Sequence, residues 1–118
     1  MKKITIFDTS VATQNIGDYI IMDSVHKELH SMFKKDMFFH LYTHDKISLA
    51  SYRINKSSDF SFIGGTNLLS SNMHFYNQWK INLIDSLFLR NIILMGVGWW
   101  QYQGKPNFYT KYLLKKVL

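Results

Sequence analysis

Short apolar runs alternate along the chain with longer stretches in which apolar residues recur every three or four positions. Four of these runs predict β-strands, at residues 4–7, 37–42, 60–63 and 92–95. The last run is apolar at every position, which is typical of a strand buried on both faces of a parallel sheet.

The stretches between the strands show helical spacing. Ile21, Val25, Leu29 and Met32 recur at spacings of four, four and three, which predicts one face of a helix that starts near Asp18. A second helix is predicted from the spacing of Tyr76, Trp79, Leu83 and Leu87, and weaker patterns predict helices at 47–54 and from Tyr109 to the C-terminus. The strand–helix alternation predicts an α/β fold of the Rossmann-like, doubly wound type with a parallel sheet. At 118 residues, we expect the whole chain, 1–118, to form one domain.

The amino-acid composition excludes several classes of protein and of functional site. Hydrophobic residues make up 47% of the chain and proline occurs once, which excludes extended disorder. Cysteine is absent, so disulfides, thiolate metal sites and a cysteine nucleophile are excluded, and a reducing compartment fits. No signal peptide is visible, and the longest apolar run, residues 92–100, is too short to cross a bilayer. We therefore expect a cytoplasmic protein without a transmembrane segment.

The chain is basic, with 14 Lys and Arg residues against eight Asp and Glu, for a net charge of +6. Such a surface favours anionic partners. The lysines are scattered in pairs along the chain, and no nucleic-acid-binding signature is present, so we expect no nucleic-acid partner.

Glycine-containing polar loops follow the first, third and fourth predicted strands, at 15–18, 64–67 and 96–100. Because the carboxyl ends of parallel strands share one edge of a sheet, these loops predict a ligand site there. The candidate binding residues are Asn15, Gly17, Asp18, Gly64, Gly65, Thr66, Asn67, Gly96, Gly98 and Trp99. An alternative stays open, since strand-to-helix turns also favour Gly and Asn, and Asp18 would complement a positive helix end. None of the loops is a Walker or dinucleotide-binding fingerprint.

At these loops the sequence resembles a known family. The segments "TQNIGDYIIMDSVHKEL" (13–29), "SDFSFIGGTNLLSS" (58–71) and "NIILMGVGWWQYQ" (91–103) resemble, in order and spacing, the polysaccharide pyruvyl transferase family. That family shows an N-x-G-D loop, a D-x-x-x-x-G-G loop after an apolar strand, and an apolar strand leading into G-V-G. The resemblance covers residues 4–118, and Thr66 stands where the family often has a third glycine.

The resemblance implies an enzyme that transfers pyruvate from phosphoenolpyruvate to a pair of sugar hydroxyls during bacterial surface polysaccharide (exopolysaccharide) biosynthesis, without a cofactor. Family members resemble glycosyltransferase-B enzymes, with two Rossmann-like domains and a cleft between them. By this resemblance the chain is the N-terminal, acceptor-side domain, and Gly17 and Asp18 form the lip of its cleft. The C-terminal domain, expected to bring the catalytic histidine and the basic residues that bind phosphoenolpyruvate, is missing. An inactive fragment is therefore expected, and no residue here receives a catalytic role. The competing interpretation is a non-catalytic Rossmann-like binding or interaction module.

The chain contains five histidines, each a candidate metal ligand or site residue. His26 and His30 are four apart, a spacing that can hold a metal, but "HKELH" is not H-E-x-x-H and no third ligand is evident. We therefore expect them on a solvated helix side and predict no metal site. His40 and His44 lie in or just after a strand, which argues against shared ligation, and His74 is the one histidine near the predicted edge.

Three aromatic residues, Trp99, Trp100 and Tyr102, follow the last glycine loop. Such side chains can stack on sugar rings, and they can equally cover the sheet or contact a second domain. Both interpretations stay open at this point.

Overall fold

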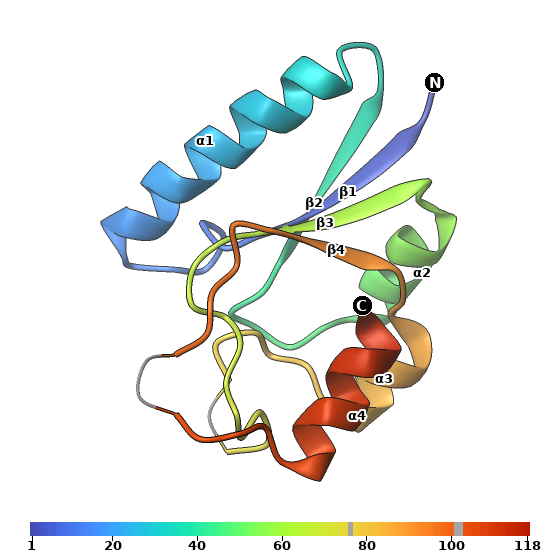
Figure 1. Ribbon diagram of the computed structural model, residues 1–118. Coiled ribbons are helices and arrows are strands. Elements are labelled where there is room, and N and C mark those ends of the chain that lie inside the picture. The colour runs from blue at the N-terminus through green and yellow to red at the C-terminus, as the bar shows by residue number, and fades with distance from the viewer. Residues whose placement is uncertain (76, 101–102) are drawn as a thin grey trace.

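The structure is a computed structural model that describes residues 1–75, 77–100 and 103–118. Strands and helices alternate along the described chain (Figure 1). In order they are β1 (Lys3–Asp8), α1 (Ile16–Met32), β2 (Met37–Tyr42), α2 (Leu49–Ser57), β3 (Phe60–Gly64), α3 (Leu83–Phe88), β4 (Ile92–Met95) and α4 (Phe108–Val117).

The four strands form one parallel sheet in the order β2-β1-β3-β4. In its register, Ile4 of β1 lies between Phe38 of β2 and Phe60 of β3. Helix α1 covers one face of the sheet, and α2, α3 and α4 lie on the other (Figure 1). The predicted α/β doubly wound fold with a parallel sheet is confirmed. The order of the strands reverses between β1 and β3, which is where folds of this type bind ligands.

The sheet separates two apolar clusters. Beneath α1, Ile4 and Ile6 of β1 pack with Met22, Val25 and Leu29 of the helix. The predicted helix stripe is therefore partly wrong, because Ile21 and Met32 are exposed and Met22 takes the inward position. The buried stripe begins one turn earlier, at Asp18, whose carboxylate accepts a hydrogen bond from the Thr13 hydroxyl and can therefore be buried.

The second, larger cluster lies between the sheet and the other three helices, and Trp79 is fully buried in it. The predicted helix through Trp79 is wrong at its start, because α3 begins only at Leu83. Asn82 and Asp85 form a reciprocal capping box that fixes this start. Before it, the Lys80 N–H donates to the Thr43 carbonyl, so this segment extends alongside the end of β2. Tyr76, also in the predicted stripe, lies outside the described residues.

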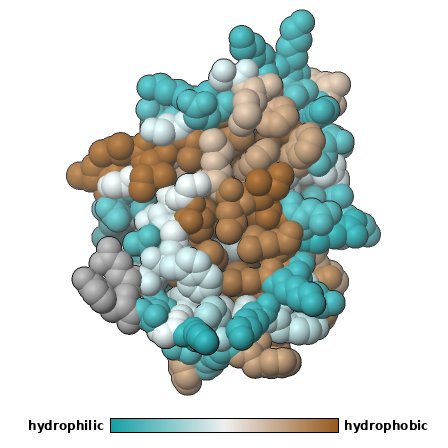
Figure 2. Space-filling view, viewed as in Figure 1, coloured by the Kyte–Doolittle hydropathy of each residue, from teal (hydrophilic) through white to brown (hydrophobic). Residues whose placement is uncertain are grey.

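Strand β4 departs from the prediction of burial on both faces. It is a terminal strand of the sheet, and Ile93 and Leu94 remain 44% and 37% exposed. Helix α1 packs mainly over β1 and β3, so on its side of the sheet Ile93 is left uncovered while Met95 still contacts the α1 cluster; Leu94 points to the opposite face. Apolar side chains gather over the middle of this side of the molecule (Figure 2).

None of the helices in the described ranges combines the length and apolar character needed to cross a membrane.

Candidate functional site at the carboxyl edge of the sheet

The three glycine loops lie at the carboxyl ends of β1, β3 and β4, which share one edge because the strands are parallel. Two of these loops form a single hydrogen-bonded unit. The Gly98 N–H donates to the Thr66 carbonyl (3.0 Å), and the Leu69 N–H donates to the Gly98 carbonyl (3.2 Å). A further bond runs from the Trp100 N–H to the Leu69 carbonyl (2.9 Å). The loops after β3 and β4 therefore act as one rigid wall at this edge.

Glycine is required in this wall by the close approach of the two loops. A Cβ on Gly65 would lie 1.8 Å from the Gly96 carbonyl oxygen, and a Cβ on Gly98 would lie 2.4 Å from Asn67 Oδ1. Gly96 itself has a φ of +66°, which L-residues rarely adopt. Gly64 packs against α1, where a Cβ would meet Met22 Sδ at 2.5 Å. The contacts that these glycines make within the chain account for their presence.

The N-x-G-D loop starts α1 in a defined way. Asn15 is the N-cap, and its Oδ1 accepts a hydrogen bond from the Gly17 N–H at 3.0 Å. Asp18, in the first turn of the helix, is only 3% exposed, and its Oδ2 accepts from Thr13 Oγ1 at 2.6 Å. Helix capping thus falls to Asn15, and Asp18 brings a buried carboxylate to the edge.

His44, two residues beyond β2, lies within electrostatic range of this carboxylate and was not among the predicted site residues. Burial lowers the pKa of its imidazole, the Asp18 carboxylate raises it, and Lys80 lowers it again, so that the net shift is downward. Its Nδ1 lies 2.8 Å from Thr43 Oγ1. An imidazole with a lowered pKa is neutral near pH 7 and can accept a proton. The signal in the sequence was its position at a strand end, the same signal that identified the glycine loops.

A small pocket lies beside the last glycine loop. It has a volume of about 150 Å³ and is lined by Ser71, Trp99, Trp100, Gln103, Gly104 and Pro106. The two indoles are 44% and 36% exposed. Pockets that enclose small-molecule ligands usually exceed about 300 Å³, so this one offers a shallow contact surface. Tyr102, the third predicted aromatic residue, lies outside the described residues.

The remaining predicted site features lie elsewhere. His74 packs on Tyr109, and its Nδ1 is 3.2 Å from Nδ2 of Asn107, the N-cap of α4. The two arginines of the chain are also remote from the glycine loops. Arg53 lies in α2, and Arg90 precedes β4 at the opposite, amino end of the strands. The carboxyl edge therefore holds no guanidinium group.

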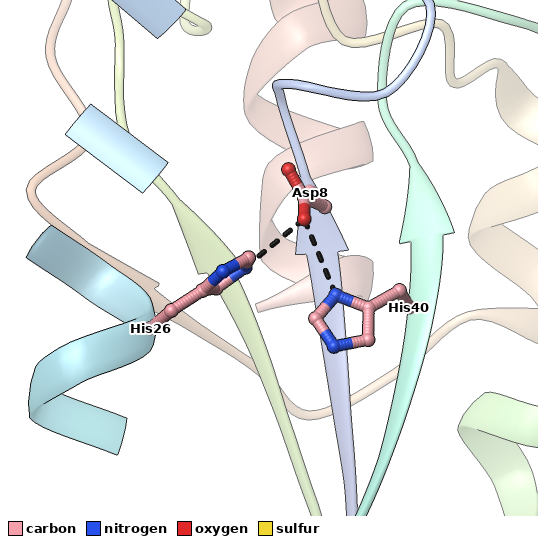
Figure 3. A group of neighbouring side chains, drawn as sticks. All are labelled: Asp8, His26 and His40. Carbon is pink, nitrogen blue, oxygen red and sulfur yellow. Dashed lines mark hydrogen bonds and ion pairs between the residues drawn. The ribbon is translucent and has the colours of Figure 1, made fainter. Parts of the chain in front are cut away.

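Three side chains from separate elements meet at the end of β1 on the α1 side of the sheet (Figure 3). Asp8 Oδ2 lies 3.0 Å from His26 Nε2 of α1 and 3.2 Å from His40 Nδ1 of β2. Burial raises the pKa of Asp8, but hydrogen bonds from His40 and Ser10 and the charge of His26 lower it more, to about 2. The sequence argued against shared ligation by His40, whereas the structure groups it with His26. His30 lies outside this group, with its ring on Phe38.

Comparison with known proteins gives one match. The family model described as polysaccharide pyruvyl transferase matches residues 15–118. Neither a curated protein nor a solved structure matches the chain significantly. The family match spans most of the chain and includes all three glycine loops at the carboxyl edge. The chain therefore belongs to the polysaccharide pyruvyl transferase family.

Proposed function

We propose that this chain forms the acceptor-side part of an enzyme that transfers pyruvate from phosphoenolpyruvate to two hydroxyls of a sugar, in the biosynthesis of a bacterial surface polysaccharide. Membership of the family supports the reaction class. The absence of cysteine supports a reducing compartment, and we place the reaction in the cytoplasm.

The observation that carries the acceptor role is the rigid wall made by the loops after β3 and β4, which presents Trp99 and Trp100 beside a shallow pocket. Indole rings offer a flat apolar face on which the C–H face of a sugar packs, and the polar surroundings can bind its hydroxyls. The backbone N–H groups of Leu69, Gly98 and Trp100 already bond within this wall, so we assign acceptor recognition chiefly to side chains. Asp18, in the first turn of the helix that follows β1, and His44, two residues beyond β2, lie at the same edge of the sheet.

The donor requires different chemistry. The carboxylate and phosphate of phosphoenolpyruvate need cations at fixed positions, and arginine is the favoured partner. Arg53 and Arg90 both lie away from the glycine loops. We therefore assign donor binding and catalysis to a second Rossmann-like domain that is not part of these 118 residues. Without it, this chain is expected to bind an acceptor but not to turn over, because both walls of a cleft must position the reacting groups.

Acceptor binding can be tested with single substitutions. We expect Trp99→Ala to weaken binding of the best ligand in a panel of bacterial oligosaccharides by roughly tenfold, since stacking contributes about 0.5–1.5 kcal/mol beyond area burial. Isothermal titration calorimetry measures the affinity. Trp99→Phe should keep part of it, and Phe88→Ala removes an exposed aromatic ring from α3, away from the pocket, and should change nothing. Equal affinity in Trp99→Ala and the unaltered protein would disprove the stacking role.

Transfer itself is tested by phosphate release from phosphoenolpyruvate with the same oligosaccharides. The 118-residue chain alone should release none above background, whereas a polypeptide that also carries the second domain should do so only with an acceptor. Acceptor-dependent release by the chain alone would show that the second domain is not needed. Binding without release by the longer polypeptide would favour a non-catalytic module.

A further inference from the structure

The group formed by Asp8, His26 and His40 is built from three elements that the fold holds in fixed relation. In the parallel register of β1 and β2, His40 lies opposite Ile6, so Asp8 is two residues further along β1 and on the same face of the sheet. His26 reaches the same point from α1, which packs on that face. The two imidazole rings are nearly perpendicular, at 86°, with centroids 4.9 Å apart. A nitrogen of each ring lies close to the same carboxylate oxygen (Figure 3).

The carboxylate is oriented by a fourth residue. Asp8 Oδ1 accepts hydrogen bonds from both the backbone N–H (2.8 Å) and the hydroxyl of Ser10. This leaves Oδ2 to face the two histidines. Metal-binding carboxylates are commonly held in this way, with one oxygen fixed by a neighbouring donor and the other directed at the ion.

One nitrogen in the group is not satisfied by the protein. His26 Nε2 is buried and lies 3.0 Å from Asp8 Oδ2, but the two are not aligned as a hydrogen bond, and this nitrogen makes none with any other described residue. A buried polar atom without a hydrogen bond is costly and calls for an explanation. A cation between the nitrogen and the oxygen would satisfy both atoms.

We propose that Asp8, His26 and His40 bind a divalent transition metal ion, with Zn²⁺ as the best fit. The ligand atoms of the three residues all lie within 4.8 Å of one another, and the two distances to Asp8 are 3.0 and 3.2 Å. Ligands about 2.0–2.2 Å from a tetrahedral zinc ion are separated by about 3.3–3.6 Å, so small side-chain rotations suffice to close the site. Two imidazoles and one carboxylate are ligands that suit Zn²⁺, Co²⁺ and Ni²⁺ better than Mg²⁺ or Ca²⁺.

The partial exposure of the two histidines leaves room for a fourth ligand. The Asp8 side chain is only 4% exposed, but those of His26 and His40 are 30% and 38% exposed. Solvent can therefore reach the ion from the side of the histidines. The metal would link α1 to β1 and β2, and α1 is the one described helix on that face of the sheet, so binding should stabilise the fold.

The competing explanation is a buried aspartate that is simply neutralised by two histidines. The two explanations differ in what a metal does to the protein. If the cluster only neutralises Asp8, Zn²⁺ should not change the stability of the protein. If it is a metal site, the chain should bind one ion, and its Tm should be higher when the ion is present.

The test uses the untagged chain, freed of metal with a chelator and titrated with Co²⁺ and then Zn²⁺. We expect each chain to bind one Co²⁺ ion, with the visible absorption bands that a Co²⁺ ion of low coordination number shows. Zn²⁺ should displace the Co²⁺. The Tm of the protein should rise with Zn²⁺ and fall again when chelator is added. His26→Ala and His40→Ala should each weaken Zn²⁺ binding at least tenfold, and so should Ser10→Ala through the orientation of Asp8.

His30→Ala is the matched control, because His30 is exposed one helical turn beyond His26 and is not in the group. It should leave Zn²⁺ affinity unchanged. Absence of a one-to-one complex would overturn the proposal, and so would a loss of Zn²⁺ affinity in His30→Ala with none in His40→Ala, which would indicate binding by His26 and His30 instead. Far-UV circular dichroism checks that each variant is folded. If His26→Ala does not fold, the variants His40→Ala and Ser10→Ala still test the proposal, because both side chains are partly exposed and their removal should leave the protein folded. These measurements involve neither sugar nor phosphoenolpyruvate, so they test the metal site independently of the proposed transferase function.

Discussion

Gly65→Ala is expected to destabilise the protein by roughly 3–5 kcal/mol. The added Cβ would lie 1.8 Å from the carbonyl oxygen of Gly96 and 2.4 Å from its carbonyl carbon. These are backbone atoms, which cannot rotate away, so the loops after β3 and β4 must separate. Separation strains or breaks the hydrogen bonds that Gly98 makes with Thr66 and Leu69. The free energy of unfolding in urea, followed by circular dichroism, measures the effect.

Two other glycines in the chain serve as controls. Gly104→Ala should be close to neutral, since a Cβ there has nothing within 4 Å. Gly64→Ala should fall between the two, because its Cβ would first meet the flexible end of Met22 (Sδ at 2.5 Å). If Gly65→Ala unfolds at the same urea concentration as Gly104→Ala, the tight contact between the two loops does not exist in solution.

Trp79→Ala is expected to lower the free energy of unfolding by about 3–5 kcal/mol, as is usual when a large buried side chain is truncated. Trp79 is 0% exposed, and its ring meets that of Phe7 edge-on at a centroid distance of 6.4 Å. Its removal would leave a cavity between β1 and the segment that precedes α3. Urea unfolding monitored by circular dichroism avoids the change in fluorescence that the substitution itself causes.

Trp79→Phe separates packing from hydrogen bonding. The buried Nε1 of Trp79 makes no hydrogen bond with the described residues, so the phenyl ring loses only part of the volume and no polar contact. We expect it to retain more than half of the stability that alanine loses. A phenylalanine variant as unstable as the alanine variant would show that the indole N–H has a partner in solution.

The sequence located the four strands because each is a compact apolar run bounded by polar or glycine residues, as Phe60–Gly64 is. It failed where tertiary context outweighed local pattern. Trp79 fits a helical stripe, but its segment extends beside β2 until the capping box at Asn82 starts α3. Ile93 is apolar without being buried, because the sequence does not reveal that β4 is the last strand of the sheet.

The candidate site was predicted in part for similar reasons. Loops that follow parallel strands must meet at one edge, so the positions of Gly65 and Gly98 followed from strand order alone. The grouping of Asp8, His26 and His40 could not be predicted in this way. It depends on the register of β1 against β2 and on the rotation of α1 about its axis, and neither is encoded in the spacing of the histidines.

The unpaired outer edge of β4 affects the behaviour of the protein in solution. A terminal strand presents backbone donors and acceptors on its outer side, and here they adjoin the exposed side chains of Ile93 and Leu94. Such an edge is a template for strand addition by other copies, which leads to aggregation at high concentration. Natural sheets often carry lysine at such positions to prevent this. Preparations of this chain will therefore keep best when dilute, and Ile93→Lys is a direct way to make concentrated samples.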